Sequence, residues 1–382
     1  MDNIYPLPLN IVLNYTSGEV KKYNLFLDKR TTEVEIDQGK TLKALRINED
    51  CSSMMLYSLD KSLRELMAKN FDFLTDQEKS YFFANQQFLM QSNKISSDSS
   101  YSSEFKMTLK DQLEMLSTID LKEQDENGKV ALTRMLNFIL DKAEAADIEY
   151  PGSYEKVKRR ISKIIMDRFE KPKFELNSSM KVFDYLLQIS LLRINLKIGD
   201  KEVIKKFLEL FDQFQEDPSC VHESLIPLLY LSKVQDICRN LSGEQQINSY
   251  RDILNSTLVD VDSRTRTFKL RGIGAGTPEH LVDEYMEKGI NGRLQDLFYY
   301  GYSLQHPRAI AKFSQFISSG NKDLQKLPLS SRIDLVSSCS SASDQKTLEI
   351  LNEMLEKCSE FAHPRIFSET IEKVHSNIAF LK

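Results

Sequence analysis

The sequence predicts a mainly α-helical protein that begins with a small β-sheet. Residues 5–59 alternate short β-branched and aromatic runs with turn residues, whereas from Asp60 onward apolar residues recur at three- and four-residue spacing. The length of 382 residues exceeds the size at which single cores stop growing, roughly 250–300 residues. We therefore expect two domains, a small β domain at residues 1–59 and a helical domain at residues 60–382.

Five short segments of the β domain are rich in β-branched and aromatic residues and are separated by turn residues such as Ser17-Gly18 and Gln38-Gly39. The predicted strands are Asn10–Tyr15, Val20–Leu27, Thr32–Asp37, Leu42–Asn48 and Ser53–Ser58. A sheet of this size has at least one open edge and is marginal unless it packs on something else. We expect it to pack on the helices or on sequence outside this chain.

The helical domain is predicted as antiparallel helix pairs stacked into a curved α-solenoid of the HEAT or armadillo kind. About fourteen to sixteen helices fit the polar breaks, and no fixed repeat period is legible. Apolar stripes in Lys201–Gln215 and along the last helix, from Ile371 to Leu381, predict core faces. Ser179–Leu196 is apolar on nearly all sides, which predicts a central helix covered on both sides.

Local signals predict where helices begin and where loops lie. Thr277-Pro278-Glu279 and His363-Pro364 are typical of helix starts, with a cap residue followed by proline. Polar, Ser-rich or Pro-Gly composition predicts exposed loops at Ser92–Ser103, Glu123–Lys129 and Glu149–Ser153.

Composition describes an ordinary globular protein, with 41% hydrophobic residues, 28% charged residues and a net charge of −5. This balance predicts no nucleic-acid partner, and the apolar runs are too short or too charged to predict a membrane partner. The five cysteines form no CxxC pair, which predicts buried thiols in a reducing compartment. With no signal peptide, the expected location is cytoplasmic, although four Asn-x-Ser/Thr sequons leave a secretory compartment open.

Motifs for catalysis are missing from the sequence. A zinc peptidase helix needs a second histidine four residues after the first, but Ile226 stands at that distance from His222. The other histidines lie at unrelated spacings, and neither a G-x-S-x-G elbow nor a P-loop occurs. We therefore expect no catalytic residue, metal ligand or cofactor in this chain.

The segment Arg271–Gly276 is rich in glycine, which predicts a flexible connection between helices whose glycines adopt positive φ. A group of basic residues lies beside this segment. The group consists of Arg264, Arg266, Lys269 and Arg271. Because guanidinium groups suit carboxylates, it is the better candidate for binding an anion such as a peptide carboxylate.

A second basic run, Lys156–Lys173, would also suit an acidic partner. It is interleaved with an apolar stripe that includes Val157 and Ile161. We therefore interpret the basic residues as the solvated face of an amphipathic helix.

In the β part, Tyr5–Leu9 resembles a Trp-x-Ile-Pro-Leu strand and Leu45–Asn48 the strand ahead of a Tyr-Arg-Val-Asn-Tyr motif. In the helical part the characteristic segments are Leu74–Ser96, Gly292–Phe298, Ala309–Leu324 and Thr370–Ile378. Taken in order, these segments resemble the C-terminal half of M1-family zinc aminopeptidases, of the eukaryotic puromycin-sensitive, oxytocinase and endoplasmic-reticulum group. The chain is divergent, since the tryptophans of the family are replaced by Tyr5, Phe313 and Phe380 and the second β motif by Cys51–Tyr57.

The resemblance implies a fragment: the end of a small, incomplete β-sandwich followed by the helical C-terminal domain. In relatives the zinc ion and the catalytic residues lie in the preceding half, so the parent protein is expected to be a zinc aminopeptidase. The resemblance further implies that this half closes over the catalytic domain and helps to bind peptides and select their length. By position, Arg271 and then Lys269 are the expected peptide-binding residues.

Two alternatives remain open at this stage. In the first, the parent is an M1 relative without peptidase activity that binds peptides or nascent chains. In the second, the chain is a free-standing helical adaptor. The expected partners are therefore peptides or nascent polypeptides and, for a fragment, the missing catalytic half.

Overall fold

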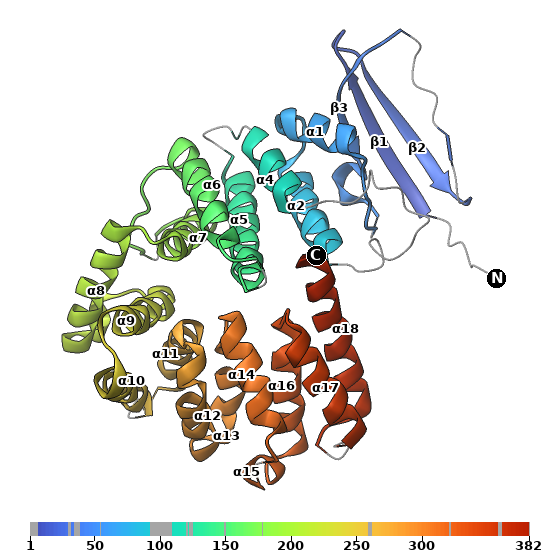
Figure 1. Cartoon of the computed structure of the whole chain (residues 1–382). Coiled ribbons are helices and arrows are strands. Elements are labelled where there is room, and N and C mark those ends of the chain that lie inside the picture. The colour runs from blue at the N-terminus through green and yellow to red at the C-terminus, as the bar shows by residue number, and fades with distance from the viewer. Residues whose placement is uncertain are drawn as a thin grey trace. The chain divides into compact units, whose positions relative to one another are not determined.

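The computed structural model describes residues 7–29, 32–33, 39–53, 55–91, 109–119, 121, 125–148, 150–177, 179–258, 262–320, 322–357 and 361–381. This part of the chain is mainly α-helical, with a small antiparallel sheet near the N-terminus (Figure 1). The predicted order, sheet first and helices after it, is confirmed. The chain divides into two compact units: the first comprises Met1–Ile139, Arg160–Lys171 and Lys181–Ser190, and the second Leu140–Arg159, Pro172–Met180 and Leu191–Lys382.

The sheet of the first unit has three strands in the order β2-β1-β3 (Figure 1). The strands are β1 (Leu7–Tyr15), β2 (Val20–Leu27) and β3 (Leu42–Ile47). Both pairings are antiparallel, and Leu13 of β1 lies opposite Lys21 on one side and Leu45 on the other. Three of the predicted strands are therefore confirmed.

The predicted strand at Ser53–Ser58 is wrong for the residues that are described there. Met55–Ser58 forms no strand, and Tyr57 bonds instead to a side chain of helix α2 (Asp76–Gln91). The Tyr57 amide donates to Asn85 Oδ1 at 3.1 Å, and Asn85 Nδ2 donates to the Tyr57 carbonyl at 2.5 Å. One side-chain amide thus satisfies the backbone groups that a sheet partner would have taken. Of the predicted strand Thr32–Asp37, residues 34–37 lie outside the described residues, and Thr32 and Glu33 are not in a strand.

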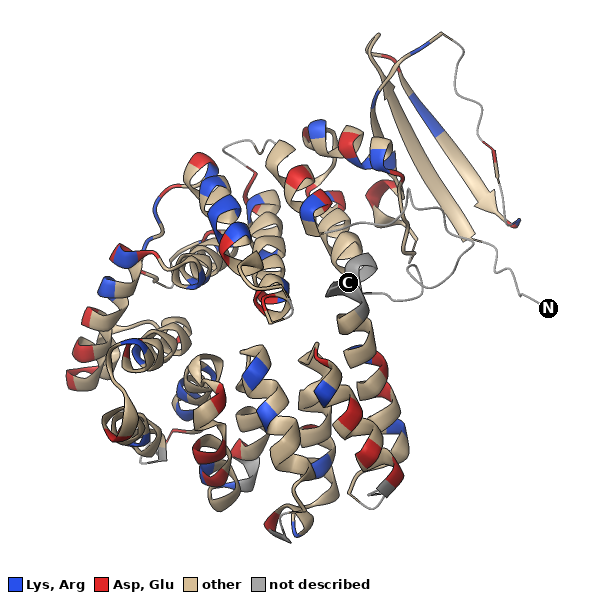
Figure 2. Ribbon diagram, in the orientation of Figure 1, with Lys and Arg blue, Asp and Glu red and all other residues tan. Residues whose placement is uncertain are grey.

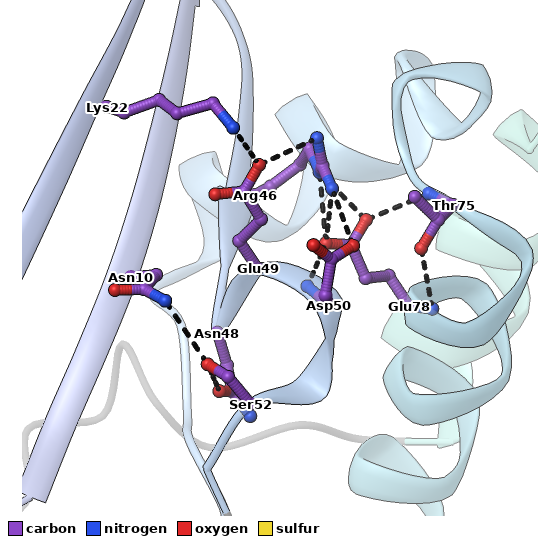
Figure 3. A network of polar contacts seen from close by, with 9 residues as sticks. All are labelled: Asn10, Lys22, Arg46, Asn48, Glu49, Asp50, Ser52, Thr75 and Glu78. Carbon is purple, nitrogen blue, oxygen red and sulfur yellow. Dashed lines mark hydrogen bonds and ion pairs between the residues drawn. The ribbon is translucent and has the colours of Figure 1, made fainter.

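Strand β3 is tied to the start of α2 by a polar network (Figure 3). Thr75 and Glu78 form a capping box: the Thr75 amide donates to the Glu78 carboxylate at 2.8 Å, and the Glu78 amide donates to Thr75 Oγ1 at 3.3 Å. The same carboxylate accepts from Arg46 of β3 and, at 2.9 Å, from the amide of Asp50. One buried acid therefore fixes both the helix start and the strand end.

The turn after β3 holds unusual backbone conformations. Asn48, Asp50 and Cys51 have φ values of 60°, 58° and 52°, a region that residues other than glycine rarely adopt. The buried Asn48 side chain supports the turn, because its Oδ1 accepts from the Ser53 amide at 2.9 Å and its Nδ2 donates to the Ser53 carbonyl at 2.7 Å. These two hydrogen bonds help to hold the strained turn in place.

The helices that follow begin with α1 (Lys61–Lys69), α4 (Leu109–Thr118) and α5 (Glu126–Ala146). The loop predicted at Glu123–Lys129 is corrected, because Glu126–Lys129 is the first turn of α5. Asp125 caps this helix by accepting from the Gly128 amide at 2.8 Å, and it forms a buried ion pair with Lys79 at 2.5 Å. The loop predicted at Glu149–Ser153 is confirmed in its described part, because Pro151 and Gly152 form a turn in which Gly152 has φ 86°. The Ser92–Ser103 prediction lies outside the described residues.

Helices α6 (Ser153–Arg168) and α7 (Val182–Ile198) follow that turn. The amphipathic prediction for α6 is confirmed, since Val157 and Ile161 are buried. The prediction that the α7 region is covered on both sides holds only for its C-terminal half. Leu191 and Leu192 are buried, but Val182 is 68% and Phe183 41% exposed.

The second unit continues with short-linked helices that pack against one another (Figure 1). They are α8 (Lys201–Glu216), α9 (Ile226–Asn240), α10 (Gly243–Leu258), α11 (Ser263–Gly276), α12 (Val282–Asn291), α13 (Leu294–Ser303), α14 (Pro307–Ser318), α15 (Lys322–Gln325), α16 (Leu329–Ser338), α17 (Gln345–Lys357) and α18 (Pro364–Leu381). Helix α11 packs on both α9 and α13, α13 on α16, and α16 on α18. The apolar stripes predicted in the α8 and α18 regions face the core, with Phe207 and Val374 fully buried.

Two predicted helix starts differ in outcome. His363-Pro364 does begin α18, and His363 Nδ1 accepts from the Arg365 amide at 3.2 Å. Thr277 instead ends α11: its hydroxyl donates to the Ile273 carbonyl at 2.8 Å, and Pro278 begins only a 3-10 turn before α12. Among the described residues, no helix is both long and apolar enough to cross a membrane.

Candidate functional site

The glycine-rich segment is the C-terminal half of α11 and not a flexible connection. Asp262 caps the helix by accepting from the amides of Arg264 and Thr265, and none of Gly272, Gly274 and Gly276 has positive φ. Glycine is needed there for close packing. A Cβ on Gly272 would lie 2.3 Å from the Pro227 carbonyl oxygen of α9, and one on Gly274 would lie 2.4 Å from Ser303 Cβ of α13.

Lys269, one of the two predicted peptide-binding residues, is buried. Its Nζ lies 5.5 Å from the ring centres of both Phe214 and Tyr230. This position suits a cation–π contact between α11 and its neighbours α8 and α9.

Arg271, the other predicted residue, is exposed. Its guanidinium carbon lies 5.6 Å from the ring centre of Tyr299 on α13. Residues two apart on a helix point about 200° away from each other. The structure therefore does not bring Arg271 and Lys269 together, and a single carboxylate does not reach both.

The other two members of the basic group are already paired with acids. Arg266 forms a buried ion pair with Asp296 of α13, with Nε 2.7 Å from Oδ2. Arg264 lies seven residues before Arg271 on the same exposed face, but it pairs with Glu223. Among the described residues no acidic side chain forms an ion pair with Arg271.

Aromatic side chains of α13 extend the surface beside Arg271. Phe298 is 37% and Tyr302 49% exposed, and their ring centres lie 4.3 Å apart. Phe298 also contacts Tyr299, at 5.3 Å between ring centres. We call Arg271, Phe298, Tyr299 and Tyr302 the α11–α13 surface. The sequence analysis missed its aromatic members, for which the run Phe298–Tyr302 was the available signal.

The electrostatics of this surface favour an anion with an apolar part. The guanidinium group is always charged, presents several donors, and is oriented by the ring of Tyr299. At the far end of the surface, burial and then the nearby Asp334 raise the pKa of Tyr302, so its hydroxyl stays neutral. The arrangement can bind a carboxylate at Arg271 and an apolar side chain on the exposed rings.

In the described part of the chain, no three His, Cys, Asp or Glu side chains lie close enough to hold a metal ion. His222 caps a 3-10 turn by accepting from the Ser224 amide. Cys339 is buried as expected for a thiol, whereas Cys220 is exposed.

The fold and the site define a mainly helical protein with an exposed cationic and aromatic surface. No known protein-family model matches the chain, and no curated protein matches its sequence.

Proposed function

We propose that this chain is the noncatalytic C-terminal region of an M1-family zinc aminopeptidase, where it binds the far end of peptide substrates and contributes to length selection. The observation that carries the proposal is Arg271, an exposed cation without an ion pair among the described residues, beside Tyr299. The order of elements, a small sheet followed by many helices, also agrees with the family resemblance.

The proposal includes an α-solenoid arrangement of the helical part. The packing of helices in the second unit supports this arrangement. One row of helices in successive contact consists of α9, α11, α13, α16 and α18, and a second row consists of α12, α14 and α17. Two such rows of alternating helices are the pattern of a solenoid of helix pairs.

In the proposed binding mode, Arg271 donates hydrogen bonds to the C-terminal carboxylate of a peptide. The last side chain of the peptide packs on Phe298 and Tyr302. Hydrogen bonds to charged groups contribute about 1.5–3 kcal/mol, so removal of the guanidinium group should weaken binding by roughly 10- to 100-fold.

A peptide-binding titration tests this site in the full chain. Arg271→Gln should weaken binding of a fluorescent peptide with a free C-terminal carboxylate, whereas Arg264→Gln, on the same face but paired with Glu223, should change it little. The matching peptide with a C-terminal amide should bind equally weakly to all three proteins. Equal affinity of wild type and Arg271→Gln for the carboxylate peptide would remove the proposed site.

A second experiment tests the parent protein. An antibody to this segment should capture an endogenous product much larger than 44.2 kDa, with upstream peptides that contain His-Glu-x-x-His. A large product with a degraded motif would favour the alternative, an M1 relative that binds peptides or nascent chains without cleaving them. A product of this chain's own size would favour a helical adaptor. The isolated chain is expected to hydrolyse no aminopeptidase substrate.

A further inference from the structure

Helix α6 carries four exposed basic residues on one face, Lys156, Arg159, Arg160 and Lys163, which we call the α6 basic stripe. They occupy positions i, i+3, i+4 and i+7 of one continuous helix, so their mutual placement follows from helix geometry alone. Figure 2 shows Lys and Arg concentrated along α6.

Within the described residues, the charges of the α6 basic stripe take part in no ion pair. No described acidic side chain pairs with any of its four members, whereas Lys158 beside them pairs with Glu155 at 2.8 Å. Like charges four residues apart destabilise a helix, and the stripe contains two such pairs. Glu155 and Asp167, each four residues from a member of the stripe, offset part of this repulsion, so the stripe contributes little to the stability of the helix.

The stripe also departs from the charge of the whole protein. Residues 153–173 contain eight Lys and Arg against three Asp and Glu, although the chain has a net charge of −5. Met166, two helical turns after Arg159 on the same side, is 72% exposed and adds an apolar contact at the end of the stripe.

We propose that the α6 basic stripe docks an acidic helix of a partner protein. The stripe spans eight residues, a rise of about 10.5 Å along the axis, and a partner helix with Glu or Asp at i, i+3, i+4 and i+7 repeats that spacing. Four acids then face four bases side by side. This surface is independent of Arg271 and of the proposed peptide site.

Two other anionic partners fit less well. Exposed Glu155 precedes the stripe and exposed Asp167 follows it, seven residues after Arg160. A flat anionic bilayer would contact these acids as well, whereas a helix of about two turns that covers only the stripe contacts neither. Single-stranded nucleic acid is held by stacking on aromatic rings, but Met166, the exposed apolar side chain at the end of the stripe, is not aromatic.

Exposed ion pairs contribute little individually, so binding should be weak and strongly dependent on salt. We expect dissociation constants between high micromolar and millimolar at low ionic strength. A tenfold rise in salt concentration shortens the Debye length about threefold and should remove most of this affinity.

The test is fluorescence anisotropy with a labelled alanine-based helical peptide that carries Glu at i, i+3, i+4 and i+7. The variant replaces all four stripe residues (Lys156→Gln, Arg159→Gln, Arg160→Gln, Lys163→Gln). The matched control replaces four exposed, scattered lysines (Lys29→Gln, Lys201→Gln, Lys346→Gln, Lys373→Gln) and has the same net charge. The stripe variant should bind at least about fivefold more weakly than both wild type and control. A peptide with Gln in place of Glu should not bind.

Circular dichroism of each variant shows whether the fold is kept, because the stripe residues are exposed and glutamine is a good helix former. Equal binding by the stripe variant and the control overturns the proposal. Absence of peptide binding by the wild type at low salt also overturns it. Binding of phosphatidylserine vesicles or of an oligodeoxythymidine to the stripe, in place of the acidic peptide, would also overturn the proposal.

Discussion

Glu78 accepts a bidentate pair of hydrogen bonds from Arg46, with Nε 2.8 Å from Oε2 and Nη2 2.8 Å from Oε1. The pair joins the last strand of the sheet to the first turn of α2. Burial alone would raise the pKa of Glu78, but the hydrogen bonds from Arg46 and from the amides of Thr75 and Asp50 lower it below its ordinary value. The ionised carboxylate is therefore the form that stabilises this part of the fold.

Glu78→Gln should lower the free energy of unfolding at neutral pH by about 1.5–3 kcal/mol, because it removes charge-assisted hydrogen bonds. A carboxyl group whose pKa is lowered by folding stabilises above its ordinary pKa and loses that contribution as the pH falls through the folded value. Wild type should therefore lose stability more steeply than the variant below about pH 4.5. Urea unfolding between pH 3 and 7 measures both effects.

Glu114→Gln is the matched control, because Glu114 is exposed on α4 and lies 3.8 Å from Lys110. It should change the stability at neutral pH by less than about 0.5 kcal/mol. Equal effects of the two substitutions would show that the network in Figure 3 does not stabilise the chain.

The close approach of α11 to α9 predicts the effect of alanine at Gly272. A Cβ there would lie 2.3 Å from the Pro227 carbonyl oxygen and 2.7 Å from Tyr230 Cβ. Although alanine favours helices, the overlap with backbone should make Gly272→Ala destabilising by about 1–3 kcal/mol. Thermal unfolding measures the loss.

Gly276→Ala provides a graded comparison, because its nearest neighbours are side-chain carbons of Val234 at 3.0 Å. Its cost should be smaller than that of Gly272→Ala. A stabilising effect at Gly272 would mean that α11 and α9 are farther apart than described.

The helices were predictable because one apolar face repeats within a single element. In α8, Phe207, Phe211 and Phe214 stand at helical spacing, and all three are buried. The Gly272–Gly276 segment was misinterpreted because its composition is that of a turn. The reason for its glycines lies in α9 and α13, which are distant in sequence, and a local pattern does not contain that information.

The candidate site was only partly predictable for the same reason. Position pointed first to Arg271 and then to Lys269, and the helix that places them on opposite faces was not expected there. The pairing of Arg266 with Asp296 depends on the packing of α11 on α13. Strand prediction failed at Tyr57 because a side chain 28 residues later satisfies its backbone.

The buried ion pair between Arg266 and Asp296 predicts a strongly non-additive pair of substitutions. Removal of one partner leaves the other charge buried, so Asp296→Leu should cost about 3–5 kcal/mol. In the double variant Arg266→Met, Asp296→Leu no charge remains buried at this place, and most of the loss should be recovered. A double-mutant cycle in urea measures the coupling. Additive losses would show that the two side chains act separately.

Lys142 of α5 donates to Asn377 Oδ1 of α18 at 2.7 Å, and Asn377 Nδ2 in turn donates to the carbonyls of Ser340 and Ala342 at 3.0 and 2.8 Å. Burial lowers the pKa of Lys142 from 10.5 to about 8, against a smaller opposing effect of Asp141. Between these two pH values the unfolded chain binds more protons than the folded chain at this residue, so the free energy of unfolding should rise with pH. One such group contributes up to about 1.4 kcal/mol per pH unit.

Lys142→Met should remove this rise, while Lys346→Met, at an exposed lysine, should keep it. Urea unfolding at several pH values from 7.5 to 10 gives the slopes, and equal slopes for wild type and Lys142→Met would show that the amino group of Lys142 is not desolvated in the folded protein.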